Sequence, residues 1–156
     1  MTLVPGAAEA VARINRAGLL AIIATNQSGI ARGLLTENDY RRVHARLLEL
    51  LAQAGGRIDG DFFCPHLPGV SAPCRCRKPG TLLYEQAAER FGIDLSASWW
   101  IGDRFRDIEP ATKLGGRGIL VRTGKGESEI AAGARTEYPL ADGVNQAVDL
   151  ILGTVG

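Results

Sequence analysis

Three short segments made up almost entirely of apolar residues constrain the fold of this chain more than any other feature of its sequence. The runs lie at residues 19–24, 98–101 and 118–121, and such runs are typical of strands buried on both faces of a parallel sheet. A further short strand is predicted at residues 61–64. Helical patterns separate the strands, at residues 5–17, 36–54, 81–91, 107–114 and 142–151. Thr36 and Asp142 are expected to cap the starts of two of these helices, and Gly92 is expected to end the helix at 81–91. This alternation predicts an α/β fold in three layers, a Rossmann-like parallel sheet with helices on both faces.

Size and charge indicate one ordinary globular domain. The chain has 156 residues, of which 46% are hydrophobic and 22% are charged, and its net charge is +1. A charge this small gives no electrostatic reason to expect nucleic acid or a membrane surface as a partner. No apolar run approaches the roughly 20 residues that span a bilayer, and the start of the chain does not resemble a signal peptide. We therefore expect a single domain over residues 1–156, monomeric and cytoplasmic.

The cysteines are clustered. All three, with one of the two histidines, lie in the segments Cys64-Pro-His66 and Cys74-Arg-Cys76. Three cysteines cannot pair off completely, and the segment is too short for a disulfide framework. Three thiolates and an imidazole make a complete tetrahedral set for a structural Zn²⁺. We predict a zinc-binding loop over residues 64–79; the alternative is three incidental cysteines.

Polar residues follow the predicted strands, and ligands of parallel sheets bind at the carboxyl ends of strands. The segment from Thr25 to Gly29 comes directly after the first run. Its hydroxyl group and successive backbone N–H groups could hold phosphate oxygens, or the segment could be a solvated turn with a helix cap. Lys78 could neutralise a phosphate as a point charge, or be an ordinary surface lysine.

Two carboxylates follow the run at residues 98–101. Asp103 and Asp107 are four residues apart, and Mg²⁺ is commonly held by one or two carboxylates together with substrate oxygens. The alternative for Asp107 is an N-cap of the helix predicted at residues 107–114. Asp107 could also do both, binding the cation and capping the helix.

Taken together and in this order, the motifs resemble those of the haloacid dehalogenase superfamily of phosphatases, in the branch of the heptose-bisphosphate and histidinol phosphatases. The resemblance covers roughly residues 5 to 150. The matching segments are TNQSGIARG (25–33), CPHLP (64–68), CRCRKPG (74–80), GDRFRDIEPA (102–111) and LVRTGKG (120–126). A zinc loop that runs directly into the lysine motif is specific to this branch.

The resemblance implies a small-molecule sugar phosphate as substrate, with Mg²⁺ and Zn²⁺ as cofactors. Thr25 would hydrogen-bond the transferring phosphoryl group, and Lys78 would balance its charge. Contacts to the rest of the substrate are implied for Asn26, Gln27, Ser28, Arg32 and Arg77. Asp103 would bind Mg²⁺ with support from Asp107, and the zinc ligands would be Cys64, His66, Cys74 and Cys76.

The family's mechanism is covalent, and its nucleophile is an aspartate in a DxDGT-like motif that ends the first, central strand. A second aspartate, two positions on, acts as acid and base. In this sequence Glu9 is the only acidic residue before Thr25, and the first aspartate is Asp39. We therefore expect an N-terminally truncated domain whose sheet lacks its central strand, which binds Mg²⁺ weakly and is inactive as given.

The resemblance favours hydrolysis of the 7-phosphate of D-glycero-D-manno-heptose 1,7-bisphosphate, with histidinol phosphate as the alternative substrate. A second hypothesis is a catalytically dead protein that binds a phospholigand. The retained Thr25, Lys78, Asp103 and Asp107 argue against long disuse. A third hypothesis, a zinc-stapled nucleic-acid module, is disfavoured by the net charge of +1.

Overall fold

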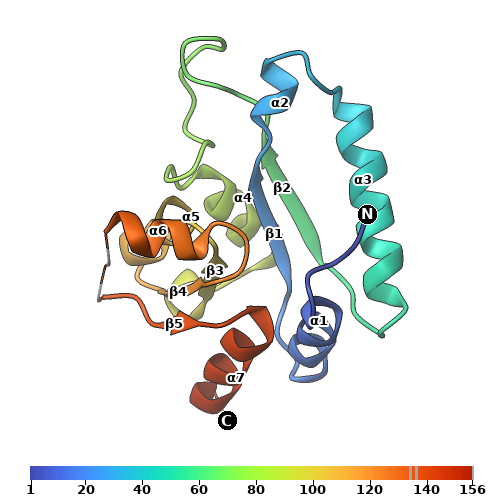
Figure 1. The fold of residues 1–156 in the computed structure, drawn as a ribbon, viewed down its shortest axis with the longest axis vertical. Coiled ribbons are helices and arrows are strands. Elements are labelled where there is room, and N and C mark those ends of the chain that lie inside the picture. The colour runs from blue at the N-terminus through green and yellow to red at the C-terminus, as the bar shows by residue number, and fades with distance from the viewer. Residues whose placement is uncertain (134, 136, 156) are drawn as a thin grey trace.

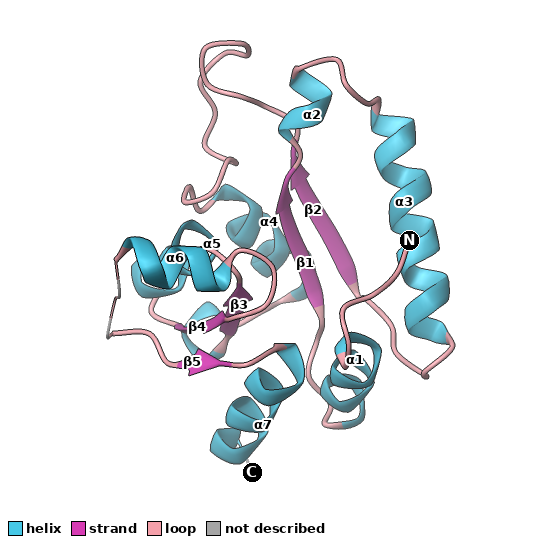
Figure 2. Ribbon diagram, viewed as in Figure 1, coloured by secondary structure: helices cyan, strands magenta, loops and turns pink. Residues whose placement is uncertain are grey.

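The structure of the chain is a computed structural model that describes residues 1–133, 135 and 137–155. Helices and strands alternate along it, as Figures 1 and 2 show. In chain order the elements are α1 (Ala7–Arg16), β1 (Ile22–Asn26), α2 (Ser28–Ala31), α3 (Glu37–Ala52), β2 (Gly60–Cys64), α4 (Leu82–Phe91), the 3-10 helix η1 (Leu95–Ala97), β3 (Trp99–Gly102), α5 (Phe105–Lys113), β4 (Arg117–Val121), α6 (Gly126–Ala132), β5 (Leu140–Ala141) and α7 (Val144–Val155).

The strands form two parallel sheets. One sheet is β1–β2 and the other is β3–β4–β5, and all described pairings are parallel. The predicted α/β fold with a parallel sheet and flanking helices is confirmed. Within the described residues, β1 and β3 are not hydrogen-bonded to each other, so the expected single sheet is divided in two where its central strand was expected to be missing.

The core explains why the run that forms β4 is apolar throughout. Ile119 and Val121 pack in a cluster with Ile151 of α7, whereas Leu120 packs with Trp100 and Ile108. Because successive side chains of a strand point to opposite faces, these are cores on the two faces of the sheet. Helix α7 covers one face and α5 the other, as predicted.

Helices also connect the two sheets. Helix α4 packs on β1 and β2, and its Tyr84 meets the ring of Trp100 in β3 at a centroid distance of 5.4 Å. The Tyr84 hydroxyl donates a hydrogen bond of 3.3 Å to the carbonyl of Asp107 in α5. Helix α1 packs against α7 below the sheets in Figure 1. None of the helices in the described residues is both long and apolar enough to cross a membrane.

Helix ends follow the local sequence closely. Thr36 is the N-cap of α3, and its side chain and that of Asp39 form a reciprocal capping box. Gly92 ends α4 in the left-handed conformation that glycine adopts readily. Both ends were predicted.

Two predicted boundaries are wrong. Helix α5 begins at Phe105 and its N-cap is Arg104, so Asp107 is not a cap: it lies within the first turn, where its side chain meets Lys78. Helix α7 begins at Val144, and the N–H of Ala147 bonds the carbonyl of Gly143, so Asp142 is not its N-cap either.

Other differences concern short elements. Strand β1 begins at Ile22 and continues to Asn26, so the polar residues Thr25 and Asn26 belong to the strand. Helix α2 and strand β5 were not predicted, because a single turn and a two-residue strand have no detectable periodicity. Residues 123–136 are expected from the sequence to form a loop that could include a short helix, and this segment contains α6. Residues 134 and 136 lie outside the described part.

Candidate phosphate and metal site

Lys78 is the centre of the site. Among the described residues it is the one charged residue that is buried, with 8% of its surface exposed. Its Nζ donates a 3.0 Å hydrogen bond to the carbonyl of Ala24 in β1 and lies 2.8 Å from Oδ1 of Asp107. Its backbone N–H donates to Oδ1 of Asn26 at 3.0 Å. Three motifs that are far apart in the sequence therefore meet at one ammonium group.

A tight turn delivers Lys78 to this position. The N–H of Gly80 donates to the carbonyl of Arg77 at 2.8 Å. A Cβ on Gly80 would lie 2.4 Å from the carbonyl oxygen of Arg75 and 2.7 Å from that of Arg77. Only glycine fits so close an approach of backbone to backbone, so the Gly80 of the lysine motif is a geometric requirement.

The carboxyl end of β1 supplies polar groups beside Lys78. The Thr25 hydroxyl accepts a 3.2 Å hydrogen bond from Nε2 of Gln27, and the Asn26 side chain clamps the backbone of Lys78. Ser28 and Arg32 belong to α2 and its C-terminal cap, directly after the strand. The structure thus gathers Thr25, Asn26, Gln27 and Lys78 at one edge.

Arg77 points elsewhere. Its Nη1 donates a 3.4 Å hydrogen bond to the carbonyl of His66 in the cysteine loop. This contact links the lysine motif to the loop rather than to the end of β1. A substrate-binding role for Arg77 remains a prediction.

Asp103 is held by a segment for which the sequence pattern suggested no role. Its Oδ2 accepts a 2.9 Å hydrogen bond from the backbone N–H of Lys125. Gly124, at φ +62°, makes this possible, because a Cβ there would lie 2.3 Å from that oxygen. A glycine-rich turn at the carboxyl end of the buried strand β4 was the signal that could have identified it.

The two aspartates offer oxygens to a hard cation. In the described structure Oδ1 of Asp103 and Oδ2 of Asp107 take part in no hydrogen bond, whereas their other carboxylate oxygens contact Lys125 and Lys78. Gly102 allows Asp107 to lie close to β3, since a Cβ there would be 2.5 Å from the Asp107 Cβ. This donor set suits Mg²⁺, which takes few protein ligands.

The cysteine loop brings its four predicted ligands together. One ligand atom from each of Cys64, His66, Cys74 and Cys76 lies within 4.8 Å of the others. The Cys64 Sγ is 3.6 Å from Cys74 Sγ and 2.9 Å from Cys76 Sγ, and Nδ1 of His66 is 3.2 Å from Cys76 Sγ. A tetrahedral Zn²⁺ with Zn–S bonds of about 2.3 Å separates its sulfur ligands by about 3.8 Å. The Cys64–Cys74 pair is close to this separation, and the Cys64–Cys76 pair would have to move apart to hold the metal.

The thiols of this cluster are electrostatically unequal. Burial, with the neighbouring Cys64 and Cys74, raises the pKa of Cys76 to about 12. For Cys74, burial acts in the same direction, but hydrogen bonds from the Arg77 backbone and the other thiols outweigh it and lower its pKa to about 7. Closely packed thiols resist losing their protons together because the thiolates would repel one another. A bound cation would offset this repulsion.

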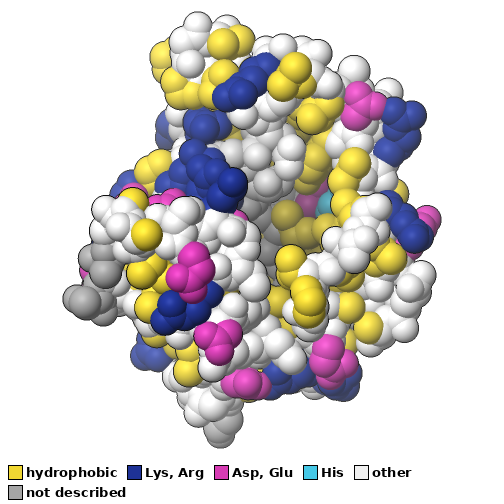
Figure 3. Space-filling view, viewed as in Figure 1, with side chains coloured by type: hydrophobic (Ala, Val, Ile, Leu, Met, Phe, Trp, Pro, Cys, Tyr) yellow, Lys and Arg dark blue, Asp and Glu magenta, His cyan; other side chains and the backbone are white. Residues whose placement is uncertain are grey.

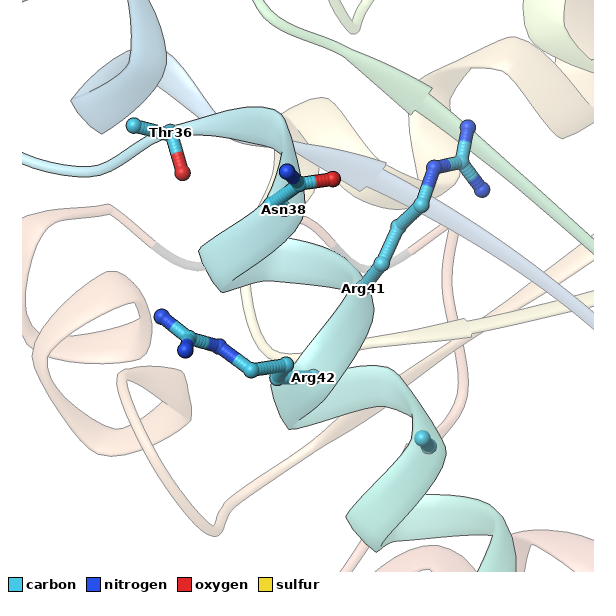
Figure 4. A pocket seen from close by; sticks show the side chains of 5 residues that line it. Thr36, Asn38, Arg41 and Arg42 are labelled. Atoms are coloured by element: carbon cyan, nitrogen blue, oxygen red, sulfur yellow. The ribbon is translucent and has the colours of Figure 1, made fainter.

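A hollow on α3 is not part of this site. It has a volume of about 530 Å³ and lies beside the start of the helix, lined by Thr36, Asn38, Arg41, Arg42 and Ala45. In Figure 4 the side chains of Arg41 and Arg42 point in different directions. They already pair with Glu37 and Asp39 of their own helix, so they do not converge on a ligand.

A parallel α/β sheet with a threonine as the next-to-last residue of one strand, a buried lysine and an aspartate pair after another strand defines a HAD-like hydrolase. Residues 75–147 match the HAD-hydrolase-like family. More particularly, the chain belongs to the family of the D-glycero-beta-D-manno-heptose-1,7-bisphosphate 7-phosphatases.

The similarity extends over most of the chain. The enzyme of that name from Pseudomonas aeruginosa is 44% identical over 123 residues, which cover 79% of this chain and 68% of the relative. The enzyme from Neisseria meningitidis is 40% identical over 82% of this chain and 67% of its own length.

Solved structures agree with these relatives. The D,D-heptose 1,7-bisphosphate phosphatase from Bordetella bronchiseptica, crystallised with magnesium and phosphate, superposes with a TM-score of 0.89 at 34% identity. The match covers 97% of this chain and 84% of the other. A HAD-like phosphatase from Mesorhizobium loti gives a TM-score of 0.80 at 29% identity, covering 99% of this chain and 76% of the other.

Proposed function

We propose that the function of this chain is the hydrolysis of the 7-phosphate of D-glycero-D-manno-heptose 1,7-bisphosphate. We further propose that it binds this phosphate between the end of β1 and the Lys78–Asp107 pair. One observation carries the proposal: the ammonium group of Lys78 lies 3.0 Å from the Ala24 carbonyl and 2.8 Å from Asp107. A buried cation with polar groups on two sides suits a dianionic phosphate. The names of the relatives support the substrate.

Each side chain has a defined task in this proposal. The Thr25 hydroxyl donates to a phosphoryl oxygen, and Lys78 turns from Asp107 to balance the phosphate charge. Asp103 and Asp107 present their free oxygens to Mg²⁺, which when bound supplies further positive charge at the phosphoryl group. Contacts to the sugar and the second phosphate are assigned to Asn26, Gln27, Ser28, Arg32 and Arg77.

Zinc has a structural part. Cys64, His66, Cys74 and Cys76 would supply all four ligands of a tetrahedral Zn²⁺, so no position would remain for substrate or water. Bound in this way, zinc would hold residues 64–79 as a rigid loop that leads directly into Lys78. In this proposal zinc removal would weaken phosphate binding because the loop that positions Lys78 would lose its fixed conformation. Zinc itself would take no part in the reaction.

Residues 1–156 alone are proposed to bind without turnover. Attack on phosphorus in this family requires an aspartate at the end of a strand, and no residue of this sequence is proposed for that task. Thr25, Lys78 and the two aspartates would still hold the phosphate. The chain is further proposed to act as a monomeric single domain in the cytoplasm, and light scattering would measure its oligomeric state.

Phosphorus NMR tests the proposal directly. The zinc-loaded protein is titrated with heptose 1,7-bisphosphate and Mg²⁺, and the 7-phosphate resonance should shift more than the 1-phosphate resonance, with no release of inorganic phosphate. Lys78→Met should abolish the shift at a temperature where circular dichroism shows the variant folded. Lys113→Met, which removes a lysine that only bonds the Pro79 carbonyl at the surface, should leave it unchanged.

Other outcomes separate the alternatives. Tighter binding of histidinol phosphate would overturn the heptose assignment, and release of phosphate would overturn the proposed inactivity. An absence of binding by either compound would overturn the proposed phosphate site.

A further inference from the structure

The three thiols of the cysteine loop differ in how far they are open to solvent. Cys64 is completely buried at the end of β2, Cys76 is 8% exposed, and Cys74 is exposed. The loop projects from the rest of the molecule at the upper left of Figure 1, and in Figure 3 the same region is in open contact with solvent. A small reactive solute therefore reaches Cys74 before the other two thiols.

A partner thiol lies close to Cys74. The Cys74 Sγ is 3.6 Å from the Cys64 Sγ, and the sulfurs of a disulfide lie about 2.05 Å apart. Cys64 is held in place, because the N–H of Gln27 donates a 2.7 Å hydrogen bond to its carbonyl and its strand pairs with β1. Cys74 lies outside any helix or strand, so it can supply the movement that brings the two sulfurs together.

Cys76 is a poorer partner for Cys74. A single residue separates the two, and a disulfide across one residue closes a small ring whose geometry departs from the preferred one. The Cys76 Sγ lies instead 2.9 Å from the Cys64 Sγ and 3.2 Å from Nδ1 of His66. Of the two possible partners of Cys74, the geometry favours Cys64.

We propose that Cys74 is a modification site for hydroperoxides, and that its oxidation, followed by disulfide formation with Cys64, reversibly releases zinc from the loop. The Cys74 sulfur takes the outer oxygen of the peroxide as the O–O bond breaks, and water or an alcohol leaves. Cys64 then attacks the resulting sulfenic acid, the S–O bond breaks, and water leaves with the Cys64 proton. Two electrons have then passed from the two thiols to the peroxide.

The disulfide removes two of the four zinc ligands. His66 and Cys76 remain, and two ligands do not complete the tetrahedron that zinc requires. The loop continues into the lysine motif, to which it is tied by the 3.4 Å hydrogen bond from Arg77 to the carbonyl of His66. Oxidation would therefore loosen the segment that precedes Lys78, and a reductant together with Zn²⁺ would restore it.

Tryptic mapping of the oxidised protein tests the switch. The zinc-loaded protein is treated with equimolar hydrogen peroxide, alkylated with iodoacetamide and digested. Trypsin cuts after arginine, so Cys64 and Cys74 share the peptide 58–75. Cys76 leaves separately, in a dipeptide with Arg77. The peptide should be lighter by the mass of two hydrogens and carry no alkyl group, whereas the dipeptide should be alkylated.

Zinc release is followed in the same reaction. A chromogenic chelator should detect about one zinc ion released per chain as the disulfide forms. Reduction with a phosphine followed by Zn²⁺ should restore the metal content. These measurements involve no phosphate ligand, so their outcome is independent of the proposed phosphatase function.

Two variants separate the roles of the thiols. Both are compared with the parent stripped of zinc, at a temperature where circular dichroism shows all three proteins folded. Cys74→Ser lacks the exposed thiol and should lose its thiols to peroxide about tenfold more slowly. Cys64→Ser retains Cys74 and should accumulate a sulfenic acid that dimedone traps.

Several results would overturn the switch. These are equal oxidation rates in Cys74→Ser and the parent, a disulfide in Cys64→Ser, a cross-link between Cys76 and the peptide 58–75, or zinc retained by the oxidised protein. An intact Cys64–Cys74 disulfide with zinc release supports it.

Discussion

Lys78 shows how much one buried charge can depend on its partner. The Lys78 and Asp107 side chains are 9% and 15% exposed, and their charged atoms lie 2.8 Å apart. A buried ion pair contributes little compared with a well-packed apolar pair, but removing one partner leaves the other charge uncompensated. Because the Lys78 charge needs a partner, we propose that an incoming phosphate takes the place of Asp107 beside Lys78.

Lys78→Met should destabilise the zinc-loaded protein by on the order of 3 kcal/mol, because Asp107 is left buried without its cation. Urea unfolding measures the change. Lys78→Met combined with Asp107→Asn should cost less than the sum of the two single changes. Strict additivity would show that the two groups do not interact.

Cys64→Ser should reduce bound zinc from about one ion per chain to nearly none, because a fully buried thiolate ligand is lost. Atomic absorption of purified protein measures the content, and the melting temperature should fall with it. Val70→Ala, at an exposed position of the same loop, should retain zinc. Full zinc occupancy in Cys64→Ser would exclude Cys64 as a ligand.

The start of helix α3 is fixed by residues close to it in the sequence, whereas the turn between β4 and α6 is fixed by a residue that is distant in the sequence. The capping box of Thr36 and Asp39 satisfies free N–H groups at the start of α3 from within four residues of sequence. The turn before α6, in contrast, holds Asp103, which lies 22 residues earlier than Lys125. The first kind of contact is visible in the sequence, and the second is not.

Thr36→Ala should cost about 1 kcal/mol of stability, as loss of an N-cap does elsewhere. Hydrogen bonds from the Thr36 backbone and hydroxyl, with that from Arg42, lower the pKa of Asp39. Its carboxylate therefore stabilises the folded state above the unfolded pKa of about 3.9, and this contribution is lost as pH falls through the folded value. Urea unfolding should show Asp39→Asn less stable at pH 7 but equal to the parent at low pH.

Gly124→Ala should cost more than about 1 kcal/mol, because its φ of +62° strains an alanine and the added Cβ would meet Oδ2 of Asp103. Mg²⁺ binding, followed by calorimetry, should weaken as Asp103 moves. Gly153→Ala is the control: a Cβ there would meet nothing within 4 Å, and within a helix the change should stabilise by up to about 1 kcal/mol. Equal melting temperatures of the two variants would contradict the strain.

The whole molecule is held together by helices that connect its two sheets. On one side α4 and α5 meet through Tyr84. On the other, Arg13 of α1 donates to Oδ1 of Asn145 at 2.7 Å and to its carbonyl at 3.2 Å, and it pairs with Asp149. These contacts join segments from opposite ends of the chain, so the two sheets are expected to unfold together.

Arg13→Ala should lower stability by about 1–2 kcal/mol, because it leaves the Asn145 groups without their charged donor. Arg16→Ala removes only an exposed pair with Glu9 and should change stability by at most about 0.5 kcal/mol. Thermal unfolding of both variants measures the difference. Two separate transitions in Arg13→Ala would show that α1 and α7 provide the coupling between the sheets.

Much of this protein could be predicted from short stretches of its sequence. The apolar runs, the helix caps at Thr36 and Gly92 and the cysteine cluster have local causes: hydrophobic periodicity, backbone N–H groups that need acceptors, and the ligand set of zinc. For the same reason the α/β class and four zinc ligands could be proposed before any contact was known.

Other features depend on contacts between residues that the sequence separates widely. The burial of Lys78, the reassignment of Asp107 from helix cap to ion-pair partner and the anchoring of Asp103 by Lys125 required the packed chain. So did the division of the strands into two sheets. Hydrophobic patterning shows that a residue faces a core, but only the packing of distant segments decides which partner it meets there.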